Sequence, residues 1–543
     1  MIKISKREKK FIVIISLFLV VATSITYSLG WLIGENTENR YLGTNQRYRE
    51  DVSVYISYIK QAKEGNILFE NLYSSEPQPK LFLAPLWLVI GWLAVIFHLP
   101  SLLAFHLVRI ILIPVLVWLA YLFIARIFQS FQKRITAALI FFLSGGFGFF
   151  FLSRYFTSSA SKPIDLWLPE SNSFLTIYHS PHWLLALILI LAVYQLLLVN
   201  LNNNRIKPFI LASFLTILLG IIHPYDLIVI IPVYGYVIFY KTLQTRNFWP
   251  NLIKYIVFLI MAGLPLLYFI LLRDFDPIFS GWFSQNVTFS AKISSTVLGY
   301  GLVFILMLVG FPCFFRDLAK KQYRYFILVW LLLNFTLLYF PNVLVQRRLV
   351  LGLLFPLSVL AAEGIWFICQ KLETIKQFQL KKVFLITLIF VLPITNLLVL
   401  TLDFSSVLTY HDLPFYLKKD YVEALAYLED ETDYDQTILA DYYVSNVIPG
   451  QIAHKVYCGH PHQTINYEEK EELVTGFYFT NTQDYLKRTW LNQSGIKYVI
   501  IGPQETKWEN KKIVKGIDLY QPDEKYYLDQ VFQNKTVAIY KVI

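Results

Sequence analysis

The sequence predicts a mainly α-helical membrane protein: a bundle of about eleven spans, followed by an extracytoplasmic α/β domain. Of the 543 residues, 56% are hydrophobic and only 16% are charged, whereas about a quarter are charged in soluble proteins. The apolar residues form long blocks, and the basic residues gather in short loops between them. Loops of this kind account for the net charge of +11, so we infer a membrane protein and no nucleic-acid partner.

The expected spans follow from the apolar blocks. The chain begins with MIKISKREKK before a long apolar run, which predicts a retained first span with its basic end in the cytoplasm. Segment 81–98 is short and contains Pro85, so we expect it to lie at the membrane surface or to re-enter without crossing. The eleven spans expected to cross are 11–33, 101–124, 135–152, 182–199, 208–222, 227–240, 255–272, 299–315, 325–340, 349–369 and 383–402.

Alternation of the spans between basic loops predicts the topology of a multi-pass protein of the cell membrane. The N-terminus is expected in the cytoplasm, and the first loop, residues 34–80, is expected outside. Residues 1–402 then form a membrane domain, and residues 403–543, which are polar and mixed in charge, form a soluble outer domain. In that domain β-like runs at 437–440, 455–459, 497–502 and 536–542 alternate with helical patterns near 418–430 and 482–493.

The first outer loop carries two adjacent acids, Glu50 and Asp51, where an amphipathic helix begins. This helix is expected to end near Gly65. Its apolar residues recur at helical spacing: Val52, Tyr55, Ile56, Ile59 and Ala62. A structural alternative is that the two acids only cap the helix and complement its dipole. Their setting in an outer loop before a segment that does not span favours chemistry on a lipid-linked substrate.

This layout resembles the GT-C superfamily of membrane glycosyltransferases, and in particular protein O-mannosyltransferases and lipid A aminoarabinose transferases. The resemblance covers roughly residues 1–402 and rests on the acidic first outer loop, the following tyrosine and the many spans. It implies that an aspartate of this loop is the general base. Asp51 precedes Tyr55 with the family's spacing and is the first candidate, and Glu50 is the second. The family often has the order Asp-Glu, whereas this chain has Glu-Asp, so both acids stay candidates. Tyr55 is assigned to substrate binding.

Three arginines complete the site that the resemblance implies. Arg109 lies inside an apolar segment, where an ionisable residue is costly and indicates function, so it is assigned to substrate binding. The alternatives for Arg109 are a snorkelling side chain or an ion pair with Asp51 or Glu50. Arg347 and Arg348 lie in an expected outer loop and are assigned to the lipid phosphate, which a guanidinium binds through two hydrogen bonds. Interfacial anchoring is the alternative for this pair.

Two histidine clusters are also expected on the outer face. His179 and His182 lie in YHSPHW, and His223 and Asp226 lie in IIHPYDLI. We assign these four residues to substrate binding by hydrogen bonds, with a divalent cation as the alternative because His and Asp are common ligands. The local alternative is a helix break at the proline of each motif. A further motif in the C-terminal part, CGHPHQT at 458–464, predicts a turn with surface histidines.

The resemblance implies transfer of a sugar from a polyprenyl-phosphate donor to a hydroxyl on the extracytoplasmic face, with inversion at the anomeric carbon. The partners are then the lipid-linked donor, a glycan, lipid or protein acceptor, and the bilayer. No nucleotide-binding fingerprint occurs in the sequence. Two alternatives stay open: a transporter or flippase of lipid-linked glycans, and a non-catalytic assembly protein of the cell envelope.

Overall fold

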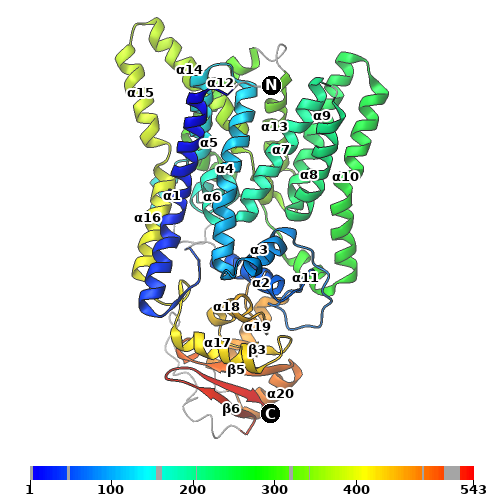
Figure 1. The fold of residues 1–543 in the computed structure, drawn as a ribbon, viewed down its shortest axis with the longest axis vertical. Coiled ribbons are helices and arrows are strands. Elements are labelled where there is room, and N and C mark those ends of the chain that lie inside the picture. The colour runs from blue at the N-terminus through cyan, green and yellow to red at the C-terminus, as the bar shows by residue number, and fades with distance from the viewer. Residues whose placement is uncertain are drawn as a thin grey trace. The chain divides into compact units, whose positions relative to one another are not determined.

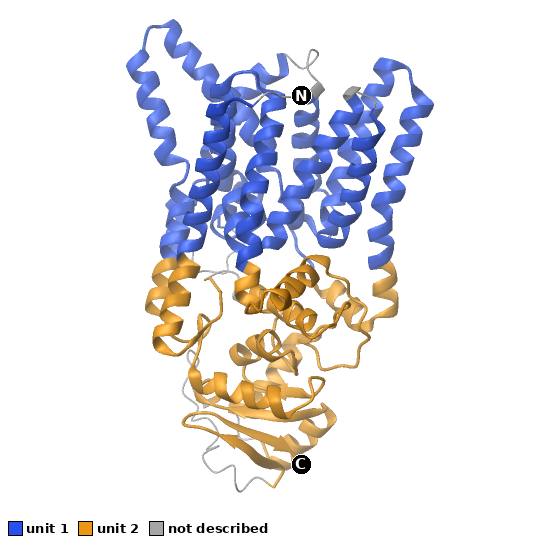
Figure 2. Cartoon of the chain, in the orientation of Figure 1, with its two compact units in different colours: residues 1–25, 106–269, 287–402 blue, residues 26–105, 270–286, 403–543 orange. Residues whose placement is uncertain are grey.

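The computed structural model describes residues 4–45, 49–154, 162–203, 205–316, 322–341, 343–479, 482–506 and 526–543. Its compact parts are two units, coloured separately in Figure 2. Unit 1 comprises residues 1–25, 106–269 and 287–402, and unit 2 comprises residues 26–105, 270–286 and 403–543. The long apolar helices run beside one another in unit 1, and the strands of the C-terminal sheet lie in unit 2 (Figure 1).

Nine helical segments of the described residues are long and apolar enough to cross a membrane. They are Lys6–Thr37, Ser101–Ile127, Phe131–Ser153, Pro181–Leu201, Pro224–Thr245, Phe248–Phe275, Ile293–Arg316, Gln346–Thr374 and Phe378–Thr409. Each contains or overlaps one of the eleven expected spans, so nine of the eleven are confirmed as segments of spanning length. The other two correspond to α8 (Ile206–Ile222) and α13 (Gln322–Leu338), which have 17 residues each, the lower end of the range for a span.

Segment 81–98 forms α3 (Pro85–Ile96), a helix of 12 residues. At 1.5 Å per residue it measures about 18 Å, well below the roughly 30 Å of a bilayer core. The expectation that it does not cross the membrane therefore stays a prediction that agrees with its length.

Unit 1 is otherwise built from long helices joined by short helical turns. The long helices are α1 (Lys6–Thr37, which continues into unit 2), α4 (Ser101–Ile127, which begins in unit 2), α5 (Phe131–Leu143), α7 (Pro181–Asn203), α9 (Leu227–Thr245), α10 (Phe248–Phe275, which ends in unit 2), α12 (Ile293–Arg316), α14 (Leu354–Thr374), α15 (Phe378–Val391) and α16 (Ile394–Thr409, which ends in unit 2). The short ones are η1 (Gly148–Arg154), η2 (Ile164–Leu166), η3 (Pro169–Ser171), α6 (Ser173–His179), η4 (Pro224–Asp226) and η6 (Gln346–Val350).

Helix α14 lies at the buried centre of unit 1. Every residue from Leu354 to Ile365 is buried inside the protein. The helix crosses α12 at two glycines, Gly310 and Gly364. A Cβ atom on Gly310 would lie 2.0 Å from the carbonyl oxygen of Leu360, so only glycine permits this backbone approach. The two glycines let the helices pack closely. Close packing stabilises a helix pair in a membrane, where the hydrophobic effect does not drive helices together.

Unit 2 contains a five-stranded mixed sheet of order β4-β3-β5-β7-β6. Strands β3 (Thr437–Leu439), β4 (Lys455–Val456) and β5 (Ile496–Ile501) run parallel, whereas β7 (Ala538–Val542) is antiparallel to β5 and to β6 (Leu528–Gln533). The helices are α17 (Lys419–Glu431), α18 (Tyr442–Ile452), α19 (Tyr467–Phe479), α20 (Asp484–Gln493) and α21 (Pro503–Thr506). The α/β character, the four expected strands and both expected helices are confirmed, and strand β6 and helices α18, α19 and α21 are additional elements.

The sheet is covered on both faces. Ile438 and Ile500 pack with α17 and α18 in one apolar cluster, whereas Leu439, Val499 and residues of α19 and α20 form the other. Successive side chains of a strand point to opposite faces, which is why neighbours such as Val499 and Ile500 serve different cores. The C-terminal domain is therefore a three-layer α/β/α structure.

The first loop is folded onto this domain within unit 2. It forms β1 (Arg40–Tyr41), α2 (Arg49–Lys63) and α3, and unit 2 also contains α11 (Pro277–Gln285). Strand β1 pairs antiparallel with β2 (Tyr416–Leu417), at the start of the C-terminal part. Residues nearly 400 positions apart are thereby joined in one compact unit.

Candidate functional site

The acidic pair lies in the first turn of α2, as expected. The apolar face of this helix is buried at Val52, Ile56, Ile59 and Ala62, and the helix ends at Lys63, two residues before Gly65. The aromatic ring of Tyr55 stacks on Trp87 of α3 at a centroid distance of 4.6 Å. This stack engages the ring of Tyr55 in packing against α3, and its assignment to substrate binding stays a prediction.

Both acids contact residues of the C-terminal domain. The hydroxyl of Tyr442, at the start of α18, donates a hydrogen bond of 2.8 Å to Glu50 Oε1. Asp51 Oδ1 lies 3.5 Å from Nε2 of His460, whose ring is buried, while the Asp51 side chain is 40% exposed. The candidate bases are therefore half-buried carboxylates, each with a polar neighbour from a segment about 400 residues away.

Helix α18 reaches α2 closely because Gly450 lies at the contact. A Cβ atom on Gly450 would come within 3.1 Å of the Ser53 carbonyl oxygen. A side chain at this position would require the backbone of α2 or α18 to move by a few tenths of an ångström.

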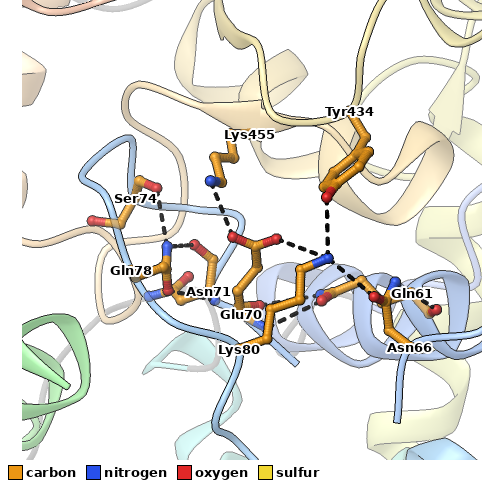
Figure 3. A network of polar contacts seen from close by, with 9 residues as sticks. All are labelled: Gln61, Asn66, Glu70, Asn71, Ser74, Gln78, Lys80, Tyr434 and Lys455. Carbon is orange, nitrogen blue, oxygen red and sulfur yellow. Dashed lines mark hydrogen bonds and ion pairs between the residues drawn. The ribbon is translucent and has the colours of Figure 1, made fainter. Parts of the chain in front are cut away.

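A polar network fastens the rest of the first loop to the same domain (Figure 3). Its centre is Glu70, a buried carboxylate that lies 3.0 Å from Lys455 Nζ and 3.6 Å from Lys80 Nζ. Gln61 of α2 exchanges two hydrogen bonds of 3.1 Å with the backbone of Glu70. Lys80 also donates to Asn66 Oδ1 at 3.0 Å. The network fixes the path of the loop that follows the acidic helix.

Arg109 of α4 is completely buried in unit 1, which excludes a snorkelling side chain. Its guanidinium donates to Thr23 Oγ1 at 3.0 Å, to Ser24 Oγ at 3.1 Å and to the Ile177 carbonyl oxygen at 3.2 Å. Nε donates to Nδ1 of His106 at 3.3 Å. All four of these acceptors are neutral, so these bonds orient the guanidinium between α1, α4 and α6 without cancelling its charge.

The two distal arginines occupy η6 and have different neighbours. Arg348 forms an ion pair of 2.8 Å with the buried carboxylate of Glu170 in η3. The guanidinium of Arg347 lies over the ring of Trp167, 5.5 Å from its centroid. The contact with Trp167 orients the guanidinium of Arg347, whereas Glu170 balances the charge of Arg348.

His182 of the first histidine cluster meets His223 of the second in unit 1. His223 Nδ1 lies 2.9 Å from Asp226 Oδ2, and both side chains are buried. The ring of His182 packs edge-on against that of His223 at 5.5 Å, and His182 Nε2 contacts the Ile222 carbonyl oxygen at 2.8 Å. His179 is buried at the end of α6, beside the ring of Tyr178. The local alternative is also realised, because α8 ends at Ile222 and α9 begins at Leu227.

A buried aspartate that the sequence analysis did not select lies in unit 1. Asp165 Oδ2 accepts hydrogen bonds from the backbone N–H groups of Gly146 and Gly148, at 2.7 and 3.1 Å. Burial raises the pKa of Asp165 to about 7, against the effect of these two donors. The glycine run at 144–148 thus forms a cradle for a carboxylate.

Four polar residues described above were not selected as site residues from the sequence: Glu170, Asp165, Tyr442 and His460. The sequence contains a signal for the first two, since the polar stretch SKPIDLWLPESNS at 161–173 lies between apolar blocks. Tyr442 and His460 carry no such signal. The expectation of surface histidines is wrong for His460, which is 3% exposed, and correct for His462, which is exposed. Among the described residues, no three His, Cys, Asp or Glu side chains gather as metal ligands would.

Comparison with solved structures assigns this architecture to a known fold. No protein-family model matches the sequence, and no curated protein matches it. Among solved structures, the archaeal oligosaccharyltransferase AglB from Archaeoglobus fulgidus, in complex with an inhibitory peptide and a dolichol-phosphate, aligns with a TM-score of 0.54. The alignment covers 91% of this chain and 70% of AglB, at 12% identity. The chain has the GT-C fold.

Two further GT-C structures also align with the chain. The arabinofuranosyltransferase AftD from Mycobacteria aligns over 96% of this chain and 41% of its own length, with 13% identity and a TM-score of 0.50. ArnT from Cupriavidus metallidurans, bound to undecaprenyl phosphate, aligns over 97% of this chain and 98% of its own, with 11% identity and a TM-score of 0.48. The alignments with AglB and AftD confirm the predicted GT-C resemblance at the level of the fold.

Proposed function

We propose that this GT-C protein is a membrane glycosyltransferase that moves a sugar from a polyprenyl-phosphate donor to a hydroxyl acceptor on the extracytoplasmic face. The observation that carries the proposal is the acidic pair in the first turn of α2, in a chain with the fold of AglB over nine-tenths of its length. AglB was solved with a dolichol-phosphate, and we extend that ligand class to this chain.

In the proposed reaction the acceptor oxygen forms a bond to the anomeric carbon of the donor. The acceptor proton passes to the carboxylate of Asp51, or of Glu50 as the second candidate. The bond between the anomeric carbon and the phosphate oxygen breaks, and its electron pair leaves with the polyprenyl phosphate. A single displacement inverts the anomeric configuration.

We assign the departing phosphate to the arginines of unit 1. Arg347 is the first candidate, because its contact with Trp167 orients a guanidinium that can bind phosphate oxygens through two hydrogen bonds. Arg348 has Glu170 as its counter-ion, and Arg109 is held by neutral acceptors. His179, His182, His223 and Asp226 are proposed to bind the substrate through hydrogen bonds.

The test uses purified full-length protein in lipid nanodiscs with a panel of radiolabelled polyprenyl-phosphate sugars and a membrane extract as acceptor. Transfer should fall by about 10²- to 10⁴-fold in Asp51→Asn, the range that a general base supplies. Glu64→Gln is the matched control, because this acid lies just past the end of the same helix. Full transfer in both Asp51→Asn and Glu50→Gln, or movement of intact donor across the bilayer without transfer, would contradict the proposal.

A further inference from the structure

The turn that carries His460 is held tightly beside the acidic helix. Thr464 Oγ1 accepts a hydrogen bond from the Gly459 N–H at 3.0 Å and donates to the Tyr73 carbonyl oxygen at 2.8 Å. The backbone N–H groups of Gln463 and Thr464 both donate to the His460 carbonyl oxygen, at 3.0 and 2.9 Å. The turn is therefore closed on itself and bound to the first loop.

Tyr73 fixes the ring of His460 from the side of the first loop. Its ring meets the imidazole edge-on at 6.0 Å, and its hydroxyl donates to the Asn446 carbonyl oxygen at 3.0 Å. Both side chains are buried, so the imidazole is confined within a packed contact. An imidazole held in this way presents one defined edge to Asp51.

The hydrogen bonds of the ring define which nitrogen carries the proton. Nδ1 of His460 accepts the backbone N–H of His462 at 3.0 Å, so in the neutral ring Nδ1 is bare and Nε2 is protonated. Nε2 is also the atom that lies 3.5 Å from Asp51 Oδ1. The imidazole consequently directs an N–H donor, and no lone pair, at the candidate base.

We infer that His460 is a positioning residue for Asp51, so that the C-terminal domain completes the catalytic site. This inference rests on the proposed function, in which Asp51 takes the acceptor proton. With Nε2–H 3.5 Å from Oδ1, the imidazole favours one rotation of the Asp51 carboxylate, which is 40% exposed. The proton and the electron pairs move as in the reaction above, and His460 itself exchanges no proton with the substrate.

Two substitutions separate this role from a purely structural one. Glutamine places its amide nitrogen as many bonds from Cα as Nε2, so His460→Gln keeps a donor for Asp51 and loses the acceptor for the His462 N–H. Asparagine places its amide oxygen as many bonds from Cα as Nδ1, so His460→Asn keeps the turn and loses the donor. The exposed neighbour provides the control His462→Asn.

With the donor found in the panel, His460→Asn should lower kcat by about 10- to 100-fold at nearly unchanged KM, and His460→Gln should retain kcat within about threefold. A structural role predicts the opposite order. If Asp51→Asn is inactive and His460→Asn keeps more than half of the wild-type kcat, the inference is wrong and the proposed function stands. If Asp51→Asn is fully active, the proposed base itself is wrong.

A spectroscopic arm tests the inference without turnover. In protein labelled with ¹⁵N on the imidazole nitrogens, the signals of His460 are those lost in His460→Gln. They should show the tautomer protonated at Nε2, and the Nε2 signal should shift in Asp51→Asn but not in the control Glu64→Gln. A ring protonated at Nδ1, or an Nε2 signal that is the same in Asp51→Asn, would overturn the inference.

Discussion

Single buried carboxylates decide how unit 2 responds to pH. Glu505 of α21 accepts hydrogen bonds from the Tyr421 hydroxyl at 2.8 Å, from the Gly502 N–H at 3.0 Å and from the Asp441 N–H at 3.1 Å. Burial raises the pKa of Glu505 to about 8, and the nearby Asp441 reinforces the shift. Burial also raises the pKa of Asp441, which caps α18 through the Val444 N–H. The folded protein is therefore more stable when each of these two carboxyl groups is protonated.

The sign of the resulting pH dependence follows from linkage. Because the folded-state pKa of Glu505 lies above the unfolded value of 4.5, its contribution to stability is fully present below pH 4.5 and is lost as pH rises through 8. Between pH 6 and pH 9 we expect the wild-type protein to lose about 2 kcal/mol of unfolding free energy from this group. In Glu505→Gln that loss should be absent.

Thermal unfolding of the full-length protein in detergent, followed by tryptophan fluorescence at pH 6 and pH 9, measures the effect. Lys497→Gln, an exposed change on β5, is the control and should keep the wild-type pH dependence. Equal pH dependence in Glu505→Gln and the wild type would show that Glu505 ionises with an ordinary pKa.

At the scale of elements, the position of the acidic helix α2 depends on contacts between the first loop and the C-terminal domain. The network around Glu70 joins the first loop to Lys455 of β4, and strand β1 pairs with β2. Within unit 2, the position of α2 is thus set by contacts with the C-terminal domain as well as by its own amphipathic pattern.

Removing the charge of Glu70 should leave two lysines without their shared counter-ion. Glu70→Gln should therefore lower the unfolding free energy by about 2 kcal/mol, since the carboxylate is buried and its lysine partners are partly exposed. The matched comparison is Glu429→Gln, which removes an ion pair with Lys60 at a 40% exposed carboxylate and should cost less than about 1 kcal/mol.

Denaturant unfolding monitored by circular dichroism gives both values. Limited proteolysis adds a local readout, because cleavage between residues 64 and 84 should become faster in Glu70→Gln alone. Two variants that are equally stable, or a more stable Glu70→Gln, would mean that the network does not stabilise the attachment of the first loop to the C-terminal domain.

For the whole molecule, the distribution of basic residues predicts the membrane topology. Basic residues of the loop at 370–382 should hold it in the cytoplasm, and the C-terminal domain should then lie outside. Nine described segments have spanning length, and α8 and α13 are long enough to complete eleven crossings.

Single cysteines report this topology in intact cells. After replacement of the three native cysteines by serine, a cysteine at Lys418, which is 44% exposed, should react with a membrane-impermeant maleimide. A cysteine at the exposed Gln377 should react only after the membrane is permeabilised. Labelling of both positions in intact cells, or of Gln377 alone, would contradict eleven crossings with an outer domain.

Patterns that are local in the chain were predictable. The apolar blocks, the amphipathic run that begins at Val52 and the strand at 496–501 each contain their own periodicity, and the structure has a helix or strand at each of them. The acid pair was predicted on the same basis, since Glu50 and Asp51 lie where that helix starts. Strand β6 and helix α19 were not predicted, because their hydrophobic periodicity is weak. Strand β6 is stabilised by pairing with β7, and α19 by packing against the sheet.

The sequence by itself therefore determined the fold class of this protein, its long apolar segments and its α/β domain, and it predicted the two candidate bases. Only the tertiary structure decided which groups lie beside the candidate residues: Tyr442 beside Glu50, His460 beside Asp51 and Glu170 beside Arg348. The physical reason is distance along the chain. Periodicity reports how a segment buries its own apolar side chains, whereas a contact between residues nearly 400 positions apart depends on the packing of the whole unit.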